Sequence, residues 1–234
     1  ITGVSLTSYL LLQYFVRERE REHERSERLL LNVLPEPVAM RLKRHEGVIA
    51  DRFEHATVLF ADIVDFTPIS ASIAPHEVVD LLDAVFSDFD ELAERYGLEK
   101  IKTIGDAYMV ASGIPTPRPD HVRAVADMAL AMLQVASSHR DGLGLRIGID
   151  TGPVVAGVIG RRKFIYDLWG DTVNTASRME SHGVPGKIQV TERVATALDG
   201  DYVLEPRGAI EIKGKGAMPT WFLRGRADDG PASD

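Results

Sequence analysis

The 234-residue chain contains no cysteine, so its fold uses no disulfide and no thiolate metal site. It also has fewer basic than acidic residues, with 27 lysines and arginines against 35 aspartates and glutamates. The resulting net charge of −8 disfavours non-specific binding to nucleic acid or anionic lipid, although a local basic pocket is still possible. Hydrophobic residues make up 44%, which is ordinary for a globular protein and predicts one domain with an appendage.

The first sixteen residues carry no charge, and the sequence changes abruptly to dense charge at Arg17. This run is slightly shorter than the roughly 20 apolar residues that span a bilayer. We interpret 1–16 as the end of a transmembrane helix, with Tyr14 and Phe15 at the membrane interface. The alternative is an apolar helix that packs on another copy of itself. The membrane interpretation predicts a protein of the cell membrane whose remaining residues are cytoplasmic.

Residues 17–45 are expected to form a helical stalk. Charges of alternating sign over 17–28 are typical of a solvated helix. Pro35 and Pro37 should stop or kink this helix near Leu34. The apolar residues form one narrow seam: Leu30, Leu34, Val38 and Leu42. Such a seam has little to bury alone, so a partner helix is expected.

A globular domain is expected over 52–225, followed by a disordered tail over 226–234. The apolar run 57–64 predicts a strand covered on both faces, and apolar residues at spacings of three and four predict helices over 75–96 and 120–137. Further expected elements are strands at 98–104, 107–112, 143–150, 153–160, 187–190, 201–213 and 219–224 and a helix at 171–181. The order strand, helix, two strands, helix, strand predicts an α+β, ferredoxin-like fold, with an antiparallel sheet and helices on one face.

Two carboxylates end predicted strands. Asp62 closes the apolar strand, and Asp106 lies at the tip of the following hairpin. Carboxylates at the ends of adjacent strands can converge, and such a pair suits two Mg²⁺ ions that keep phosphate oxygens in their shell. Each aspartate taken alone would be interpreted more simply as a turn cap.

Five sequence segments favour the metal-site interpretation: FADIVDFT (60–67), KTIGDAYMV (102–110), RIGIDTGPVVAG (146–157), YDLWGDTVNTASRMES (166–181) and EIKGKG (211–216). In this order they resemble the signature segments of the class III adenylyl and guanylyl cyclase family, over about residues 54–224. The resemblance implies a class III cyclase catalytic domain. It implies an adenylyl cyclase, which makes cyclic AMP and pyrophosphate from ATP.

The resemblance also implies which residues bind metal. Asp62 and Asp106 match the family's metal ligands, and the backbone carbonyl of Ile63 would complete one shell. Two Mg²⁺ or Mn²⁺ ions are expected per active site. We interpret Asp65 as structural, because the ligand pair is complete without it. From the same segment, Phe66 and Thr67 are assigned to substrate binding.

Other matched positions concern the ribose and the phosphates. Asn174 and Arg178 match the family's transition-state pair, and their i, i+4 spacing puts both on one helical face. Asparagine can orient the ribose, and arginine can meet charge that develops on the α-phosphate. Lys213 matches the lysine that holds the terminal phosphates, with Lys215 as a near alternative. Arg162 is a candidate for a further phosphate contact.

Lys102 and Asp167 match the positions that select the base. Adenine offers an acceptor at N1 and a donor at N6, which a lysine and a carboxylate complement. Guanine reverses both groups, and guanylyl cyclases carry a glutamate and a cysteine at these positions. The pair in this chain therefore predicts ATP as the substrate.

In the family, the metal carboxylates and the remaining site residues come from opposite protomers. This chain carries both sets, which implies a head-to-tail homodimer with two equivalent sites and an inert monomer. Three alternatives stay open. One is a guanylyl cyclase. Another is a non-catalytic, dimerising regulatory module, which would be expected to have lost one of these residues. The third is a diguanylate cyclase, whose GGDEF hairpin is replaced here by KTIGDAY.

Overall fold

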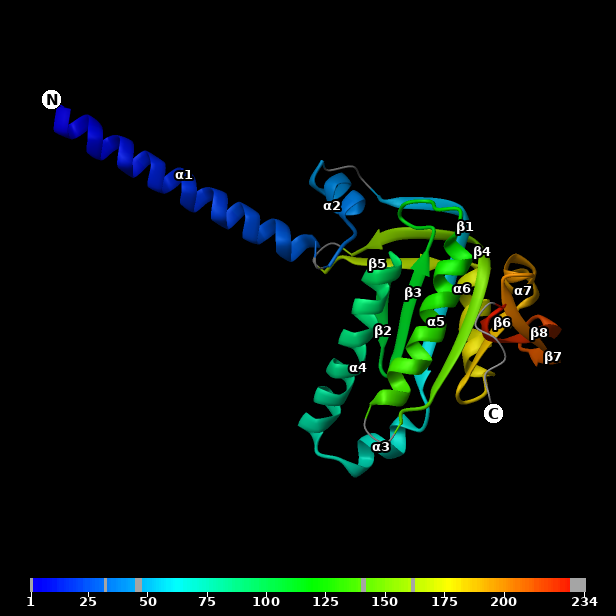
Figure 1. Ribbon diagram of the computed structural model, residues 1–234. Coiled ribbons are helices and arrows are strands. Elements are labelled where there is room, and N and C mark those ends of the chain that lie inside the picture. Colours follow the sequence, from blue (N-terminus) through cyan, green and yellow to red (C-terminus); the bar gives the residue numbers. More distant parts are fainter. Residues whose placement is uncertain (1, 32, 45–47, 140–141, 161–162, 228–234) are drawn as a thin grey trace. The chain divides into compact units, whose positions relative to one another are not determined.

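The computed structural model describes residues 2–31, 33–44, 48–139, 142–160 and 163–227 (Figure 1). The chain divides into two compact units. The smaller comprises Ile1–Ile49 with Val158–Tyr166, and the larger comprises Ala50–Gly157 with Asp167–Asp234. Arg162, the candidate for a further phosphate contact, lies outside the described residues, as does most of the tail expected over 226–234.

Two helices form most of the smaller unit: α1 (Thr2–Leu31) and α2 (Glu36–Lys43). Helix α1 continues through Arg17, where the sequence suggested a boundary between a membrane segment and a stalk. It ends at Leu31, four residues before Pro35, because in a continued helix the proline ring would clash with the Leu31 carbonyl. No helix in the described ranges is both long and apolar enough to cross a membrane. The membrane segment at 1–16 stays a prediction, without support from this helix.

The larger unit is built on a sheet. Its strands are β1 (Ala50–Ile63), β2 (Glu99–Ile104), β3 (Ala107–Ser112), β4 (Leu145–Ile159), β5 (Ile165–Trp169), β6 (Lys187–Thr191), β7 (Tyr202–Ile212) and β8 (Gly216–Arg226). The strand order is β2-β3-β1-β4-β6-β8-β7, and β5 pairs with β4. Along this path β4 and β6 are parallel, and the other neighbours are antiparallel.

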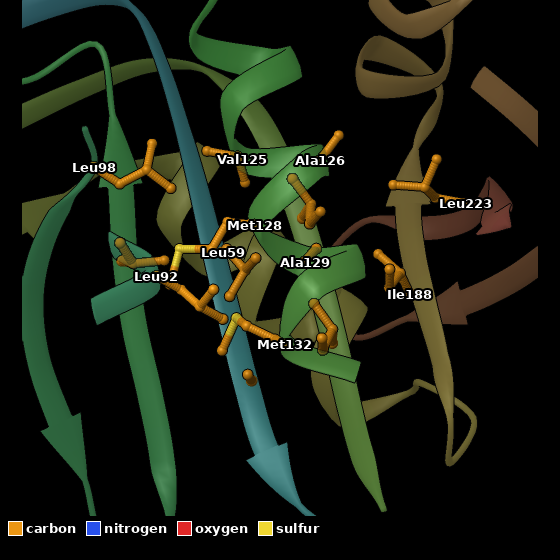
Figure 2. Close-up of a cluster of buried hydrophobic side chains, with 14 of the residues drawn as sticks. Leu59, Leu92, Leu98, Val125, Ala126, Met128, Ala129, Met132, Ile188 and Leu223 are labelled. Carbon is orange, nitrogen blue, oxygen red and sulfur yellow. The ribbon is translucent and has the colours of Figure 1, made fainter. Parts of the chain in front are cut away.

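Five helices complete the unit: α3 (Phe66–Ser72), α4 (Pro75–Tyr96), α5 (His121–Ser138), α6 (Asp171–Ser181) and α7 (Glu192–Leu198). Helices α4 and α5 lie side by side (Figure 1) and bury their apolar stripes against the sheet. Figure 2 shows Met128 and Met132 of α5 close to Leu59 of β1 in this core. The core on this face fixes the position of β1, whose end carries Asp62.

Helix α6 packs against the opposite face of the sheet, at Gly148 of β4. The neighbours Ile147 and Ile149 belong to the α4–α5 core, so strand alternation turns position 148 to the other face. A Cβ at Gly148 would lie 2.0 Å from the backbone nitrogen of Glu180 and 2.5 Å from the backbone carbon of Met179. Helix backbone therefore rests directly on strand backbone, which only glycine permits.

The predicted α+β class and the ferredoxin-like order of elements are confirmed, with three corrections. The sheet is mixed, not wholly antiparallel, because β4 and β6 are parallel neighbours. Parallel neighbours need a crossover, and that crossover contains α6. Because α6 lies on the face opposite α4 and α5, the helices do not all lie on one face. The two strands expected at 143–150 and 153–160 are one strand, β4, which stays paired with β1 through Thr151 and Gly152.

Replacing Gly148 with alanine is expected to destabilise the fold, because the added Cβ would collide with the backbone of α6. The free energy of unfolding, measured by urea denaturation, should fall by about 1–3 kcal/mol, the usual cost of overpacking. Gly225→Ala in β8 is the matched control, since a Cβ there meets no atom within 4 Å. An equal, small effect of both substitutions would contradict the direct packing of α6 on β4.

Candidate active site

The two candidate metal carboxylates lie side by side at one end of the sheet. Asp62 is opposite Ala107, the first residue of β3, and Asp106 directly precedes Ala107 in the β2–β3 turn. Gly105 completes this turn with φ +64°, a conformation that favours glycine. Burial, and then the nearby Asp62 carboxylate, raise the pKa of Asp106 above its usual range. The two carboxylates therefore lie close together, as expected from their positions at the ends of adjacent strands.

An arginine that the sequence reasoning missed completes this cluster. Arg146 of β4 lies opposite Asp62 in the sheet, and its Nη2 nitrogen donates to Asp62 Oδ2 at 2.5 Å. The Nε atom of Arg146 lies 3.5 Å from Glu180 Oε1 of α6. Burial raises the pKa of Glu180 to about 7, to which the charge of Asp62 also contributes. Arg146 opens one of the five sequence segments, but only the β1–β4 register reveals its partner.

The donor set of this cluster fits a hard divalent cation. Asp62 and Asp106 offer carboxylate oxygens, the ligands that Mg²⁺ prefers. Within the described ranges no three histidine, cysteine or acidic side chains are grouped so that they could hold a metal. A cation here would therefore take further oxygens from backbone, water or phosphate, as Mg²⁺ commonly does. Ile63, whose carbonyl is the predicted third ligand, is the last residue of β1.

The residues after Ile63 turn away from the strand. Asp65 has a left-handed backbone, with φ 57°, and precedes the first turn of α3. Its backbone oxygen accepts a hydrogen bond from Ile69 N at 3.1 Å, in keeping with a structural role. The side chain of Phe66 packs against the hydrophobic core, and Thr67 is exposed. Substrate contact by Phe66 and Thr67 stays a prediction.

Asn174, Arg178 and Lys213 line one cavity of about 460 Å³. The first two lie on the exposed side of α6, one turn apart, and Lys213 lies in the turn between β7 and β8. Asp62 and Asp106 are not among the residues that line this cavity. The chain thus presents the candidate phosphate and ribose residues apart from the candidate metal ligands.

Lys102 and Asp167 contact each other although they are 65 positions apart in the sequence. Lys102 Nζ of β2 donates to Asp167 Oδ2 of β5 at 2.5 Å. The other oxygen of Asp167 accepts a hydrogen bond from Leu168 N at 2.8 Å, which fixes the carboxylate. The side chains remain 34% and 16% exposed, so the pair is reachable by a ligand. A donor and an acceptor are therefore held next to each other.

Comparison with known proteins identifies the family that the chain resembles. A family model described as "Adenylate and Guanylate cyclase catalytic domain" matches residues 48–225. An adenylate cyclase of Mycobacterium tuberculosis (strain ATCC 25618 / H37Rv) is 56% identical over 212 residues, which cover 88% of this chain and 48% of that protein. Atrial natriuretic peptide receptor 2 of Homo sapiens is 46% identical over 233 residues, which cover 94% of this chain and 22% of that protein.

A solved structure agrees with the fold. The catalytic core of a rhodopsin-guanylyl cyclase with converted specificity, in complex with ATPalphaS, has a TM-score of 0.73 and 38% sequence identity. The similarity covers 76% of this chain and 98% of that one. The present chain therefore spans about half or less of the curated relatives above, but nearly the whole of a solved catalytic core.

The Asp106→Asn substitution tests the cation site without measuring turnover. Millimolar Mn²⁺ should raise the melting temperature of the unchanged protein, because a ligand that binds only the folded state stabilises it. The variant should lose most of this increase, while its melting temperature without added metal stays equal or rises, since repulsion from Asp62 is removed. Asp83→Asn, an exposed position on α4, is the control. A Mn²⁺ response that Asp106→Asn leaves intact would rule out this carboxylate as a ligand.

Proposed function

Because the chain belongs to the adenylate and guanylate cyclase catalytic domain family, we propose that it is an adenylyl cyclase, which converts ATP to 3′,5′-cyclic AMP and pyrophosphate. Both kinds of cyclase occur among its relatives, so family membership alone does not identify the base. The observation that carries the choice of ATP is the contact between Lys102 and Asp167.

The Lys102–Asp167 contact supports adenine because of its polarity. The ammonium group is a donor only and the carboxylate is an acceptor only. Adenine presents its N1 acceptor next to its N6 donor, so the base can replace the direct contact with two complementary hydrogen bonds. Guanine would bring the N1–H donor to Lys102 and the O6 acceptor to Asp167. Both of its polar groups would then face a side chain of the wrong kind.

The cavity lined by Asn174, Arg178 and Lys213 supports a triphosphate and ribose site. Three cationic side chains line it, Arg178, Lys213 and Lys215, and such groups are suited to phosphate oxygens. The Asn174 amide can hold the ribose in position for attack by its 3′ hydroxyl on the α-phosphorus. Positioning and charge stabilisation are the main contributions that a protein makes to phosphoryl transfer. Arg178 would meet the charge that develops on the α-phosphate.

We assign Asp62, Asp106 and the Ile63 carbonyl to two Mg²⁺ or Mn²⁺ ions. When bound, these ions would supply Lewis-acid stabilisation of the attacking 3′ oxygen and of the leaving pyrophosphate. Asp62 is held by Arg146 at 2.5 Å, so its carboxylate is already oriented at the end of β1. Arg146 adds a further positive charge near the proposed metal ions and the phosphates that would bind them.

We further propose that two chains form each active site, in a head-to-tail homodimer. The lining of the Asn174–Lys213 cavity leaves out the metal carboxylates, as expected if a second chain supplied them. Each site would then take Asp62 and Asp106 from one chain and the base-reading and phosphate residues from the other. The symmetry of such an arrangement gives two equivalent sites. A site shared in this way requires each chain to carry both the metal ligands and the base-reading and phosphate residues. This sequence carries all of the predicted key residues.

The choice of ATP is tested by measuring kcat/KM for ATP and GTP on the unmodified protein. Two mismatched polar groups at about 1–3 kcal/mol each predict roughly a hundredfold or greater preference for ATP. Changing Lys102→Glu together with Asp167→Cys should erode this preference and permit some use of GTP. Equal values for both nucleotides, or a preference for GTP, would overturn the adenylyl assignment.

The shared site is tested by mixing two inactive variants. An Asp106→Ala chain lacks a metal ligand, and an Arg178→Ala chain lacks the transition-state cation. A heterodimer of the two contains one site with every residue intact, so the mixture should recover up to about a quarter of the unmodified activity, given random pairing of equal amounts. Mixing Asp106→Ala with Asp62→Ala, which damage the same half, is the matched control and should stay inactive. An inactive first mixture, with heterodimers demonstrated by tagged pull-down, would refute the shared site.

A further inference from the structure

An ion pair ties the β7–β8 turn to the helix that carries Asn174 and Arg178. Lys215 Nζ donates to Asp171 Oδ2 at 2.6 Å. Asp171 is the first residue of α6, where a negative charge is favoured by the helix dipole. Lys215 lies three residues after the end of β7. The contact thus joins two elements that are 44 positions apart in the sequence.

The two lysines of this turn are in different environments. The side chain of Lys215 is only 23% exposed, and it lines a small cavity together with Thr175, Met218 and Pro219. Both lysines line the larger cavity that also contains Asn174 and Arg178. Lys215 therefore has a carboxylate partner and a packed stem, whereas among the described residues Lys213 has no ion-pair partner and its charge stays available in that cavity.

The backbone of the turn does not by itself hold Lys213 in place. Lys213 is followed by Gly214 with φ +83°, and Lys215 is followed by Gly216 with φ +72°. Glycines at such positions leave the chain many alternative conformations. One backbone hydrogen bond, from Lys215 N to Ile212 O at 2.9 Å, closes the turn. The side-chain contact between Lys215 and Asp171 links this turn to α6, and it lies two residues from Lys213.

We propose that Asp171 and Lys215 are a positioning pair, which holds the β7–β8 turn against α6 so that Lys213 reaches the same phosphate group as Arg178. This inference rests on the proposed function, since it assigns Lys213 to the phosphates of ATP. It also decides between the two lysines of the turn: Lys213 contacts the substrate, and Lys215 acts through Lys213.

Asp171→Asn separates the positioning role from direct phosphate binding by Lys215. If Lys215 bound phosphate, removing the carboxylate would free this lysine and lower KM for ATP. A positioning pair predicts the opposite, a rise in KM of about two- to fivefold, as expected from losing a partly exposed ion pair. The value of kcat should change less than about twofold, because Asn174 and Arg178 stay in place. An unchanged or lower KM overturns the proposal.

The two lysines are compared by matched substitutions. Lys213→Met should raise KM by about tenfold or more, since it removes a charged contact to phosphate. Lys215→Met keeps the packed stem and should raise KM only as much as Asp171→Asn does. The double variant Asp171→Lys with Lys215→Asp restores an ion pair of reversed polarity, and its KM should return to within about twofold of the unmodified value. A larger effect at Lys215 than at Lys213, or no recovery in the double variant, contradicts positioning.

A structural readout does not depend on the proposed function. Hydrogen exchange of the backbone amides over 212–216 should be faster in Asp171→Asn, because the turn is released from α6, while β6 and α5 exchange as before. Glu205→Gln is the matched control, since Glu205 pairs with Arg224 within the same β7–β8 hairpin, away from the turn. It should leave both exchange at 212–216 and KM unchanged. Unchanged exchange in Asp171→Asn would overturn the positioning role of the Asp171–Lys215 pair, whether or not the protein turns over ATP. Faster exchange in a protein that turns over no ATP would support the positioning role and refute the proposed function.

Discussion

In β1, Asp62 lies opposite Ala107 of β3 on one side and Arg146 of β4 on the other, and the candidate metal cluster depends on this register. A slip by one residue would turn Asp62 toward the other face of the sheet. The slip is prevented by the core, because Leu59, Ala61 and Ile63 must all remain buried. The apolar residues of β1 therefore position the carboxylate cluster, although none of them could take part in its chemistry.

Helix α6 connects this cluster to the cavity lined by Asn174 and Lys213. Its backbone rests on Gly148 of β4, two residues from Arg146. Near its end Glu180 lies 3.5 Å from Arg146, and at its start Asp171 holds Lys215. One short helix thus contacts both groups of functional residues within a chain. Because a close backbone contact leaves little freedom to shift, the relative placement of these groups is set by the helix–sheet packing rather than by the exposed side chains.

The sequence predicted the parts of the fold that have a local signal. The apolar run of β1 and the three- and four-residue spacing of α4 and α5 gave these elements, and the signature segments gave the candidate residues. Contacts between distant segments had no such signal: the register that joins Asp62 to Arg146, and the parallel pairing of β4 with β6, depend on how whole elements pack. The short elements α3, β5 and α7 were missed. The helices α3 and α7 have only seven residues each, about two turns, which is too few to show the helical period.

The cavity lined by Arg178 and Lys213 is a local basic site in a chain whose net charge is −8. Lys102 and Arg146 each have a carboxylate partner within the chain, Asp167 and Asp62, and neither cation is fully exposed. Unpaired cations in partly buried positions would be costly, so these carboxylates stabilise the chain by itself. Under the proposed function, adenine enters between Lys102 and Asp167 and replaces their ion pair with two hydrogen bonds. In the proposed positioning role the Asp171–Lys215 pair differs, because it stays closed and leaves Lys213 to meet the phosphates together with Arg178.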